Sequence, residues 1–296
     1  MSSTVNIYVV VYMKPEFITI QNTYLKKHCI DKFKHIIINN GKDDAIKNEI
    51  SKTCQDNGID CIEYDRPPNI PHLCSHSHSV ALEYALNNFI KKDNKDDITV
   101  VIDSDVFPFK QFSFYDILNS KMIAGMYQQR TLNPGLTPKQ EFIYLSAIFT
   151  MFKNSIDLSE FSFQKGYGDT GSGTSELITK YPTEFIKHTA AIDIESDYIF
   201  KNNKNMQYPY KKEYKCQFLC NCFIHYYRGS NWAESDPKYH SSKLAFVKTF
   251  LENPVKYHLN LDEYISYSTA HSDKGFNGID HNYKDYNFYR IFKSTK

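Results

Sequence analysis

The chain has 296 residues and a formal net charge of +1 at pH 7, with 35 basic and 34 acidic side chains. This balance lacks the basic excess typical of proteins that bind nucleic acid, so we expect no nucleic-acid partner. The length allows one large domain or two small ones, with a core that needs no disulfide support.

The first hundred residues alternate between apolar runs of strand length and segments with helical periodicity. The expected strands are 5–12, 35–41, 60–65 and 98–106, and the expected helices are 17–29, 43–58 and 73–90. In the second helix, Asp43 suits the N-cap and Gly58 suits the C-terminal end. This alternation predicts right-handed βαβ units and a parallel sheet, in which ligands bind beyond the carboxyl ends of the strands.

After Phe109 the pattern is weaker. We expect strands in KMIAGMY and LSAIFTMF, a glycine-rich loop in QKGYGDTGSGTSE, one strand in CQFLCNCFIHYYRGSNW and a helix in SSKLAFVKTFLEN. No repeat or long linker divides the chain, so we expect one domain over 1–235 and an extension over 236–296 that packs on it.

Seven cysteines are present, without the second ligand pair that a zinc site requires. They therefore predict reduced thiols in a cytoplasmic protein. The apolar run near the N-terminus lacks a basic lead and has the length of a strand, which argues against a signal peptide. No run approaches the roughly 20 apolar residues that span a bilayer, so we expect no membrane span.

The stretch ITVVIDSDVFPF places two aspartates, Asp103 and Asp105, where a buried strand ends. Two carboxylates at this spacing can bind one hard cation, Mn²⁺ or Mg²⁺, which bridges to phosphate and neutralises charge on a departing phosphate. Acidic residues are also common in ordinary loops after strands, so an isolated Asp-x-Asp is weak evidence. Its place after the fourth strand of a βαβ series strengthens the metal-site hypothesis.

VVIDSDVF resembles the DxD motif of the GT-A glycosyltransferases, which transfer sugars from nucleotide-sugar donors. SHSVALEYAL, YGDTGSGT and HYYRGSNW resemble further segments of GT-A-like proteins, several of them from large DNA viruses, so that the resemblance covers about 5–235. It implies an α/β fold, a GT-A (Rossmann-like) three-layer sandwich around a mostly parallel sheet. It also implies a donor half at about 1–110 and an acceptor half at about 111–235.

The resemblance further implies roles for single residues. Asp103 and Asp105 would hold the metal, with His225 as a third ligand, although a histidine at a strand end is as often a hydrogen-bonded core residue. The residues expected to contact the donor are Tyr12, Asn39, Asn40, Asp65, His78 and Ser104. Tyr12 would stack on the base, and His78 near a helix start would meet the diphosphate. Turn chemistry explains the Asn and Asp residues equally well.

Asp169 is the candidate general base, because an inverting transfer needs one carboxylate to take the proton of the acceptor hydroxyl. Glu176 is the reserve base, and an Asp-Gly turn is the structural alternative. Trp232 could form a wall for a sugar ring or simply pack in the core.

The leading function is a metal-dependent hexosyl- or related transferase, acting on a glycan or protein acceptor. A haloacid-dehalogenase-type phosphatase is one alternative, but its motif normally follows the first strand. A non-catalytic GT-A-like binding protein is the other. The tyrosine-rich segment from Tyr257 to Tyr289 is a candidate cover for the acceptor site or a homodimer contact.

Overall fold

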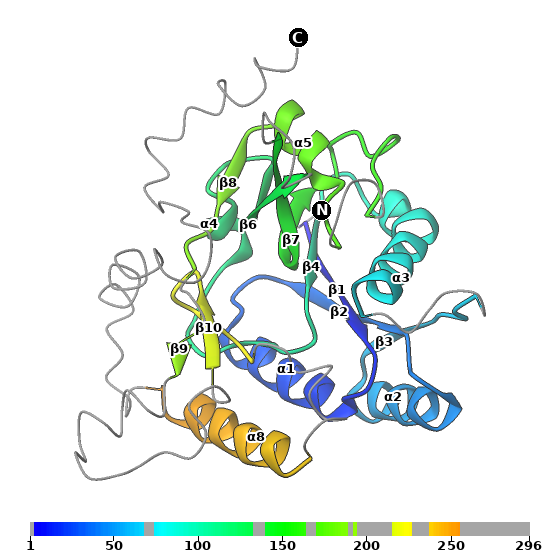
Figure 1. Cartoon of the computed structure of the whole chain (residues 1–296), viewed down its shortest axis with the longest axis vertical. Coiled ribbons are helices and arrows are strands. Elements are labelled where there is room, and N and C mark those ends of the chain that lie inside the picture. Colours follow the sequence, from blue (N-terminus) through cyan, green and yellow to red (C-terminus); the bar gives the residue numbers. More distant parts are fainter. Residues whose placement is uncertain are drawn as a thin grey trace.

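The computed structural model describes residues 3–67, 74–132, 140–163, 170–188, 192–193, 215–226 and 237–254. Its centre is a seven-stranded sheet with the order β3-β2-β1-β4-β7-β6-β8 (Figure 1). The strands are β1 (Val5–Val11), β2 (Phe33–Asn39), β3 (Asp60–Glu63), β4 (Ile98–Ile102), β6 (Ile123–Leu132), β7 (Gln140–Lys153) and β8 (Thr183–Phe185).

The sheet is mostly parallel, as the strand-helix alternation predicts. Strands β1, β2, β3 and β4 are all mutually parallel where they pair, and β8 is parallel to β6. Only β7 runs against its neighbours, β4 and β6. The chain therefore has an α/β fold, and the carboxyl ends of β1, β2, β3 and β4 meet at one edge of the sheet.

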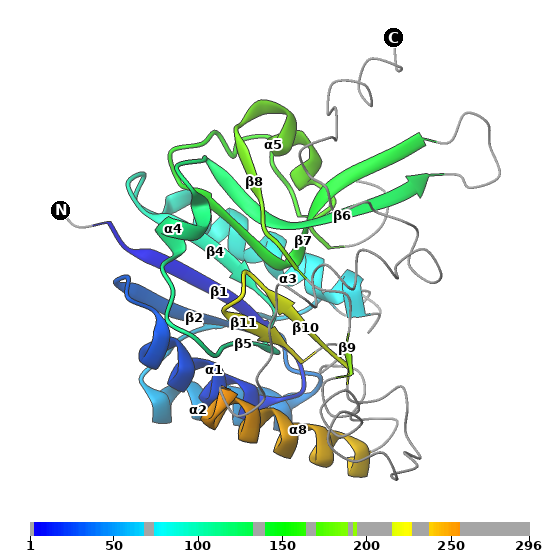
Figure 2. The same cartoon turned by 90° about the vertical axis from the view of Figure 1, so that its left-hand side faces the viewer.

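Helices cover both faces of the sheet, and together they form three layers (Figure 2). The described helices are α1 (Pro15–His28), α2 (Asp44–Asn57), α3 (Cys74–Asn88), the 3₁₀ helix η1 (Ile90–Lys92), α4 (Phe114–Leu118), α5 (Thr174–Lys180) and α8 (Pro237–Glu252). Successive residues of β1 enter different cores: Val9 packs with Ile18 of α1 and Ile50 of α2, whereas Val10 packs with Ala81 of α3. Both faces of β1 are thus buried, which explains its uninterrupted apolar sequence.

Helix α2 has the two end signals that the sequence indicates. The Asp43 side chain accepts a hydrogen bond from the Ile46 N–H at 3.0 Å. Gly58 ends the helix in the left-handed region, with φ of 62°. Helix α1 starts at Pro15, earlier than expected, because proline is well suited to the first helical position.

A second, four-stranded sheet lies beside the first and has the order β5-β11-β10-β9. Its strands are β5 (Val106–Pro108), β9 (Ile192–Asp193), β10 (Lys215–Leu219) and β11 (Phe223–His225). Strand β5 follows the two aspartates directly and pairs antiparallel with β11, so that Val106 stands opposite His225.

The single strand expected from Cys216 onward is wrong, because this segment forms the β10–β11 hairpin. Cys220 and Asn221 both adopt left-handed backbone angles, with φ of 52° and 56°. The Cys222 N–H closes the turn on the Leu219 carbonyl at 3.1 Å. Such turns usually carry Asn-Gly or Asp-Gly, and Cys-Asn gives no comparable signal in the sequence.

Helix α8 joins the fold through a third apolar cluster. Val247 and Phe250 of α8 pack with Phe17 of α1 and with Phe107 and Phe218 of the second sheet. The division at residue 235 remains a prediction, and the segment from Tyr257 to Tyr289 lies outside the described residues.

None of the helices in the described part of the chain is long and apolar enough to cross a bilayer. Six of the seven cysteines are free thiols: Cys29, Cys54, Cys61, Cys216, Cys220 and Cys222.

Candidate metal and nucleotide site

The Asp103–Val106 turn connects the two sheets. Strand β4 ends at Ile102, and the Val106 N–H donates to the Asp103 carbonyl at 3.2 Å, which closes the turn. The Asp103 N–H donates to the Ile148 carbonyl of β7, at 3.1 Å. On the other side, the Tyr226 N–H donates to the Asp105 carbonyl at 2.7 Å. The turn is therefore anchored to the central sheet through β7 and to the second sheet through the end of β11.

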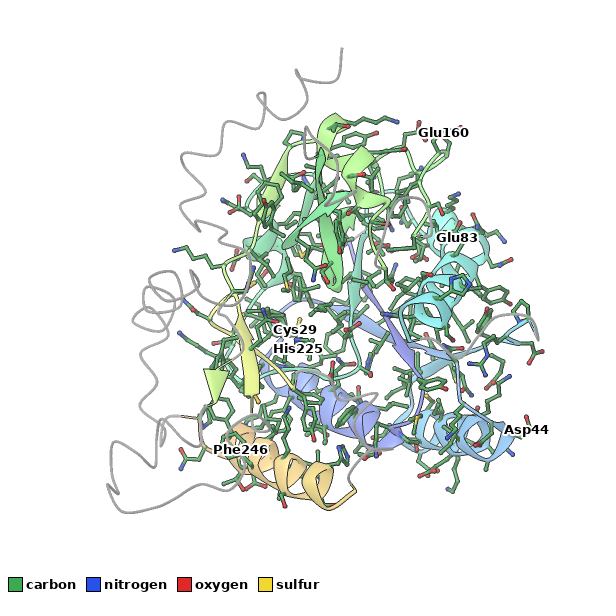
Figure 3. The ribbon with its side chains drawn as sticks, in the orientation of Figure 1. Cys29, Asp44, Glu83, Glu160, His225 and Phe246 are labelled. Atoms are coloured by element: carbon green, nitrogen blue, oxygen red, sulfur yellow. The ribbon has the colours of Figure 1, made fainter. Side chains whose placement is uncertain are left out.

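Three side chains with metal-binding atoms converge at this turn. Asp103, Asp105 and His225 each offer one ligand atom, and these atoms all lie within 4.8 Å of one another. The His225 Nε2 is 3.2 Å from the Asp105 Oδ1, and both side chains are almost fully buried. Figure 3 labels His225 near the middle of the view. Two carboxylates and an imidazole suit a divalent ion such as Mn²⁺ or Mg²⁺, so the residues present fit the expected metal.

A buried amide orients the imidazole. The Gln217 Nε2 lies 3.3 Å from the His188 Nδ1, and the Gln217 Oε1 lies 3.2 Å from the His225 Nδ1. With the amide nitrogen donating to His188, the amide oxygen accepts the proton of the His225 Nδ1. The Nε2 lone pair of His225 then faces Asp105 and is available to a metal. Gln217 and His188 were not predicted, because no sequence motif marks them.

His78 and Ser104 lie beside the three metal-binding side chains. His78 is on α3, and its Nε2 is 3.7 Å from the Asp103 Oδ1. Ser104 is a half-buried residue of the turn itself. The structure thus brings these two residues to the metal ligands, while their contact with a donor stays a prediction.

Tyr12 and Asn40 belong to a second group, at the ends of β1 and β2. The Asn40 amide donates to the Ser77 Oγ at 2.9 Å, and Arg66 reaches the same oxygen at 3.3 Å. The Arg66 guanidinium lies 5.9 Å from the centre of the Tyr12 ring. Arg66 and Ser77 were not expected here. The one available signal is that Arg66 is among the few arginines of a lysine-rich chain.

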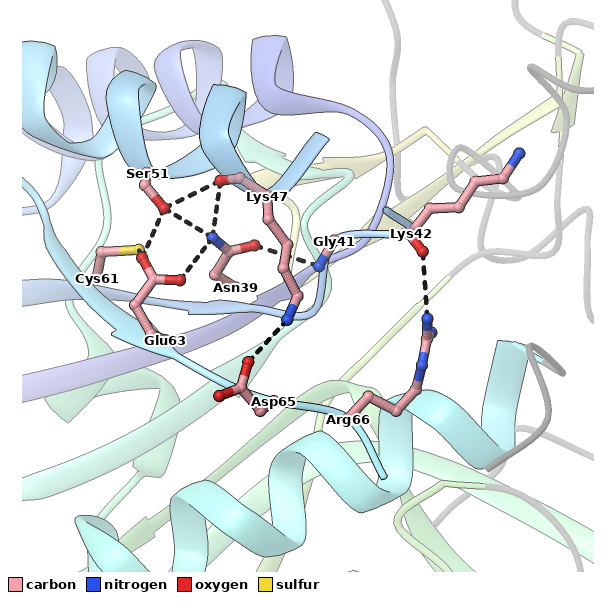
Figure 4. Close-up of polar contacts among 9 residues, drawn as sticks. All are labelled: Asn39, Gly41, Lys42, Lys47, Ser51, Cys61, Glu63, Asp65 and Arg66. Atoms are coloured by element: carbon pink, nitrogen blue, oxygen red, sulfur yellow. Dashed lines mark hydrogen bonds and ion pairs between the residues drawn. The ribbon is translucent and has the colours of Figure 1, made fainter. Parts of the chain in front are cut away.

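Asn39 is a fully buried link between β2, α2 and β3 (Figure 4). Its Nδ2 lies 2.9 Å from the Lys47 carbonyl, 2.8 Å from the Ser51 Oγ and 3.1 Å from the Glu63 Oε2. Its Oδ1 accepts from the Gly41 N–H at 3.2 Å. These contacts are all internal to the chain, and they give Asn39 a structural role whether or not it touches a ligand.

Asp65 lies close to this group but is exposed to solvent. Its carboxylate pairs with the Lys47 Nζ at 3.1 Å (Figure 4). Its contact with the ribose or base stays a prediction, as does that of Asn39.

Asp169 and Trp232 lie outside the described residues. The segment that follows Asp169 is packed on β7. The Thr174 hydroxyl accepts from the Leu145 N–H at 2.7 Å and donates to the Gly171 carbonyl at 2.7 Å. Gly171 has a φ of 92°, and a Cβ there would collide with the Leu145 carbonyl. Glu176, the reserve base, is half-buried in the first turn of α5.

No protein-family model matches the chain, and no curated protein matches it. Similar solved structures include the mannosyltransferase PcManGT from Pyrobaculum calidifontis in complex with GDP-Man and Mn²⁺. It is 12% identical, with 61% of this chain and 54% of that chain covered and a TM-score of 0.41.

Two further similar structures are TarS from S. aureus and the apo-form glycosyltransferase GlyE from Streptococcus pneumoniae TIGR4. TarS is 12% identical over 62% of this chain and 37% of its own, with a TM-score of 0.35. GlyE is 15% identical over 68% of this chain and 50% of its own, with a TM-score of 0.32. The chain thus spans between about a third and about a half of the length of these solved proteins.

Proposed function

We propose that this protein is a metal-dependent glycosyltransferase that moves a sugar from a nucleoside-diphosphate donor to an acceptor hydroxyl. One observation carries the proposal: the ligand atoms of Asp103, Asp105 and His225 lie within 4.8 Å of one another. They do so beyond the carboxyl end of β4, beside β1, at the edge where open α/β sheets bind their ligands.

The residues around the turn suit the diphosphate of a nucleotide sugar. Asp103, Asp105 and His225 would hold Mn²⁺ or Mg²⁺, which when bound neutralises charge on the departing diphosphate. His78, 3.7 Å from Asp103, would donate a hydrogen bond to a phosphate oxygen. Ser104 would contribute the hydroxyl of the turn.

The nucleoside end of the donor would lie over the group at the ends of β1 and β2. Tyr12 offers an aromatic face for the base, and the Arg66 guanidinium beside it offers planar donors. Asn40, Asn39 and Asp65 are the proposed contacts to base or ribose. Asn39 is the last residue of β2 and the others lie on loops after parallel strands, which supports one continuous donor site.

We assign the general base to Asp169, which would take the proton of the attacking hydroxyl and give inversion at the anomeric carbon. The position of the chain just after Asp169 supports this assignment. Gly171 packs against the β7 backbone around Leu145 and Ala147, next to Ile148, which anchors Asp103. The acceptor would be a glycan or protein. A hexosyl substrate, a homodimer, a cytoplasmic location and a viral origin remain predictions.

The test is metal-dependent turnover of a panel of UDP-, GDP- and dTDP-sugars. We expect slow release of a nucleoside diphosphate with Mn²⁺ and none with EDTA. Asp169→Asn should lose sugar transfer but keep nucleotide binding. Asp157→Asn is the matched control, because Asp157 follows the far end of β7, next to the start of β4.

Two results would refute the proposal. Release of inorganic phosphate from sugar phosphates would indicate a haloacid-dehalogenase-type phosphatase. Silence with every donor, together with no thermal shift on adding nucleotide sugars, would indicate a non-catalytic binding protein.

A further inference from the structure

A buried amide lies directly against the Asp103–Val106 turn. Gln21, on α1, is fully buried. Its Nε2 is 3.0 Å from the Asp103 carbonyl and 2.8 Å from the Val106 carbonyl. These are the carbonyls of the first and last residues of the turn. A primary amide has two N–H donors, so Gln21 has one for each carbonyl.

This arrangement fixes the other half of the amide. With both N–H groups donating, the Gln21 Oε1 is an acceptor, and it lies 3.0 Å from the Nε2 of His35 on β2. The His35 Nε2 must therefore carry a proton. Burial, with a small contribution from Lys26, lowers the pKa of His35 to about 3, so that the ring is neutral near pH 7. Its Nδ1 has no hydrogen-bond partner among the described residues.

Each hydrogen bond is thus donated toward the turn: His35 donates to Gln21, and Gln21 donates to the two carbonyls of the turn. These contacts allow a single assignment of hydrogens. They connect strand β2 of the central sheet to the backbone on both sides of Asp105. A divalent ion demands that its carboxylate ligands stay at fixed positions. The backbone of this turn sets the positions of both aspartates, so a firm hold on its carbonyls limits how far the ligands can drift.

We propose that Gln21 and His35 are positioning residues that hold the two aspartates in their metal-binding arrangement. The inference rests on the proposed function only in taking this turn as a metal site. Gln21 bonds to backbone carbonyls of the turn, and His35 bonds to Gln21. A merely structural role would predict lower stability without a specific loss of metal affinity, and this difference makes the inference testable.

The experiment measures binding of Mn²⁺ alone, from the electron paramagnetic resonance signal of the free ion. Gln21→Met keeps the length of the side chain but removes both donors. Partners that orient metal ligands typically change metal affinity by 10- to 100-fold, so we expect a Kd for Mn²⁺ that is about 10- to 100-fold higher.

Asn154→Leu is the matched control. Asn154 is also a buried amide, bonded to the Thr99 hydroxyl at 2.7 Å and to the Asn94 carbonyl at 3.1 Å. It lies at the opposite end of β4 from Asp103. We expect this variant to lower the melting temperature and to leave the Mn²⁺ affinity unchanged.

A second pair of variants decides the question if Gln21→Met does not fold. His35→Gln can still donate an N–H to the Gln21 Oε1, whereas His35→Leu cannot. We expect His35→Gln to bind Mn²⁺ like the wild type and His35→Leu to bind it more weakly. Equal affinities in these two variants, or wild-type affinity in a folded Gln21→Met, would overturn the inference.

The result is separable from the test of the transferase. A wild-type protein that binds Mn²⁺ but turns over no nucleotide sugar would refute the transferase and leave the positioning pair standing. A Gln21→Met variant that keeps its Mn²⁺ affinity would refute the pair and leave the transferase standing. A wild-type protein that binds no Mn²⁺ at millimolar concentration would refute both.

Discussion

Two polar clusters lie at the carboxyl edge of the parallel strands, and they are built on opposite principles. In the cluster around Asn39, side-chain donors of the protein itself bind the acidic groups. Glu63 accepts from Asn39 and from Ser51, the latter at 2.6 Å, and Asp65 pairs with Lys47. At the Asp103–Val106 turn, the two carboxylates converge instead on one point, together with an imidazole. The first cluster joins secondary-structure elements, and the second is suited to receive a cation.

The strongest test of this difference between the two clusters is to remove the negative charge at the Asp103–Val106 turn. Asp103→Asn combined with Asp105→Asn should weaken Mn²⁺ binding by at least about 1,000-fold, because amides replace the charged oxygens that hard cations prefer. Thermal stability should change little, because relief of the repulsion between the neighbouring carboxylates offsets their weakened contacts with His78 and His225. Spin resonance and thermal unfolding measure the two quantities. A large loss of stability would show that the aspartates are part of the framework instead.

Asn39→Leu should instead lower stability and leave Mn²⁺ binding unchanged. It would leave the buried Gly41 N–H without its acceptor, and it would take one partner each from the Lys47 carbonyl and the exposed Glu63 carboxylate, which both keep the Ser51 hydroxyl. We expect a total loss of about 2–3 kcal/mol, mostly from the buried N–H, measured by urea unfolding, and an unchanged affinity for Mn²⁺. A loss below about 1 kcal/mol would contradict the structural role of this amide.

Gly41 tests how tightly the first cluster is packed. A Cβ at this position would lie 2.7 Å from both the Lys47 N and Cγ atoms, so Gly41→Ala should cost about 1–3 kcal/mol as an overpacked site. Gly58→Ala is the control, since it meets no atom within 4 Å and should cost about 1 kcal/mol through its left-handed backbone alone. Urea unfolding of both variants compares the two effects, and a stable Gly41→Ala would show that α2 can shift.

A further expected effect is a pH dependence of the stability that comes from His35, behind the Asp103–Val106 turn. The pKa of His35 is lowered from 6.5 to about 3 by burial, so between these values the unfolded chain binds a proton that the folded chain does not. This residue therefore makes stability fall as the pH drops through that window, by up to about 1.4 kcal/mol per pH unit. His35→Gln should show a shallower slope in urea unfolding between pH 4 and 7. Identical slopes would mean that folding does not lower the pKa of His35.

The first half of the fold was predictable because two independent signals agree there. Apolar runs define β1, β2 and β4, and turn or cap residues such as Asp43 and Gly58 mark the boundaries of α2. The second half gave weaker signals. Helix α5 follows a glycine-rich stretch and has only seven residues, and the β10–β11 hairpin turns at Cys220 and Asn221. Elements this short depend on what packs against them more than on their own sequence.

The candidate site divides in the same way. Asp103 and Asp105 were predictable because a motif places them together after a strand, and the structure brings His225 to them. Gln21 and His35 were not, because a glutamine inside a helix and a histidine inside a strand give no sequence signal. Only the fold reveals that Gln21 binds the turn and that His35 binds Gln21.

The pairing of β5 with β11 has a consequence for how the protein matures. The two aspartates emerge early in synthesis, whereas the imidazole that joins them belongs to a hairpin made much later. A growing polypeptide would therefore display an incomplete coordination sphere until that hairpin docks. Uptake of a divalent ion would then report that folding has been completed, and the ion would favour the finished molecule over every partly assembled one.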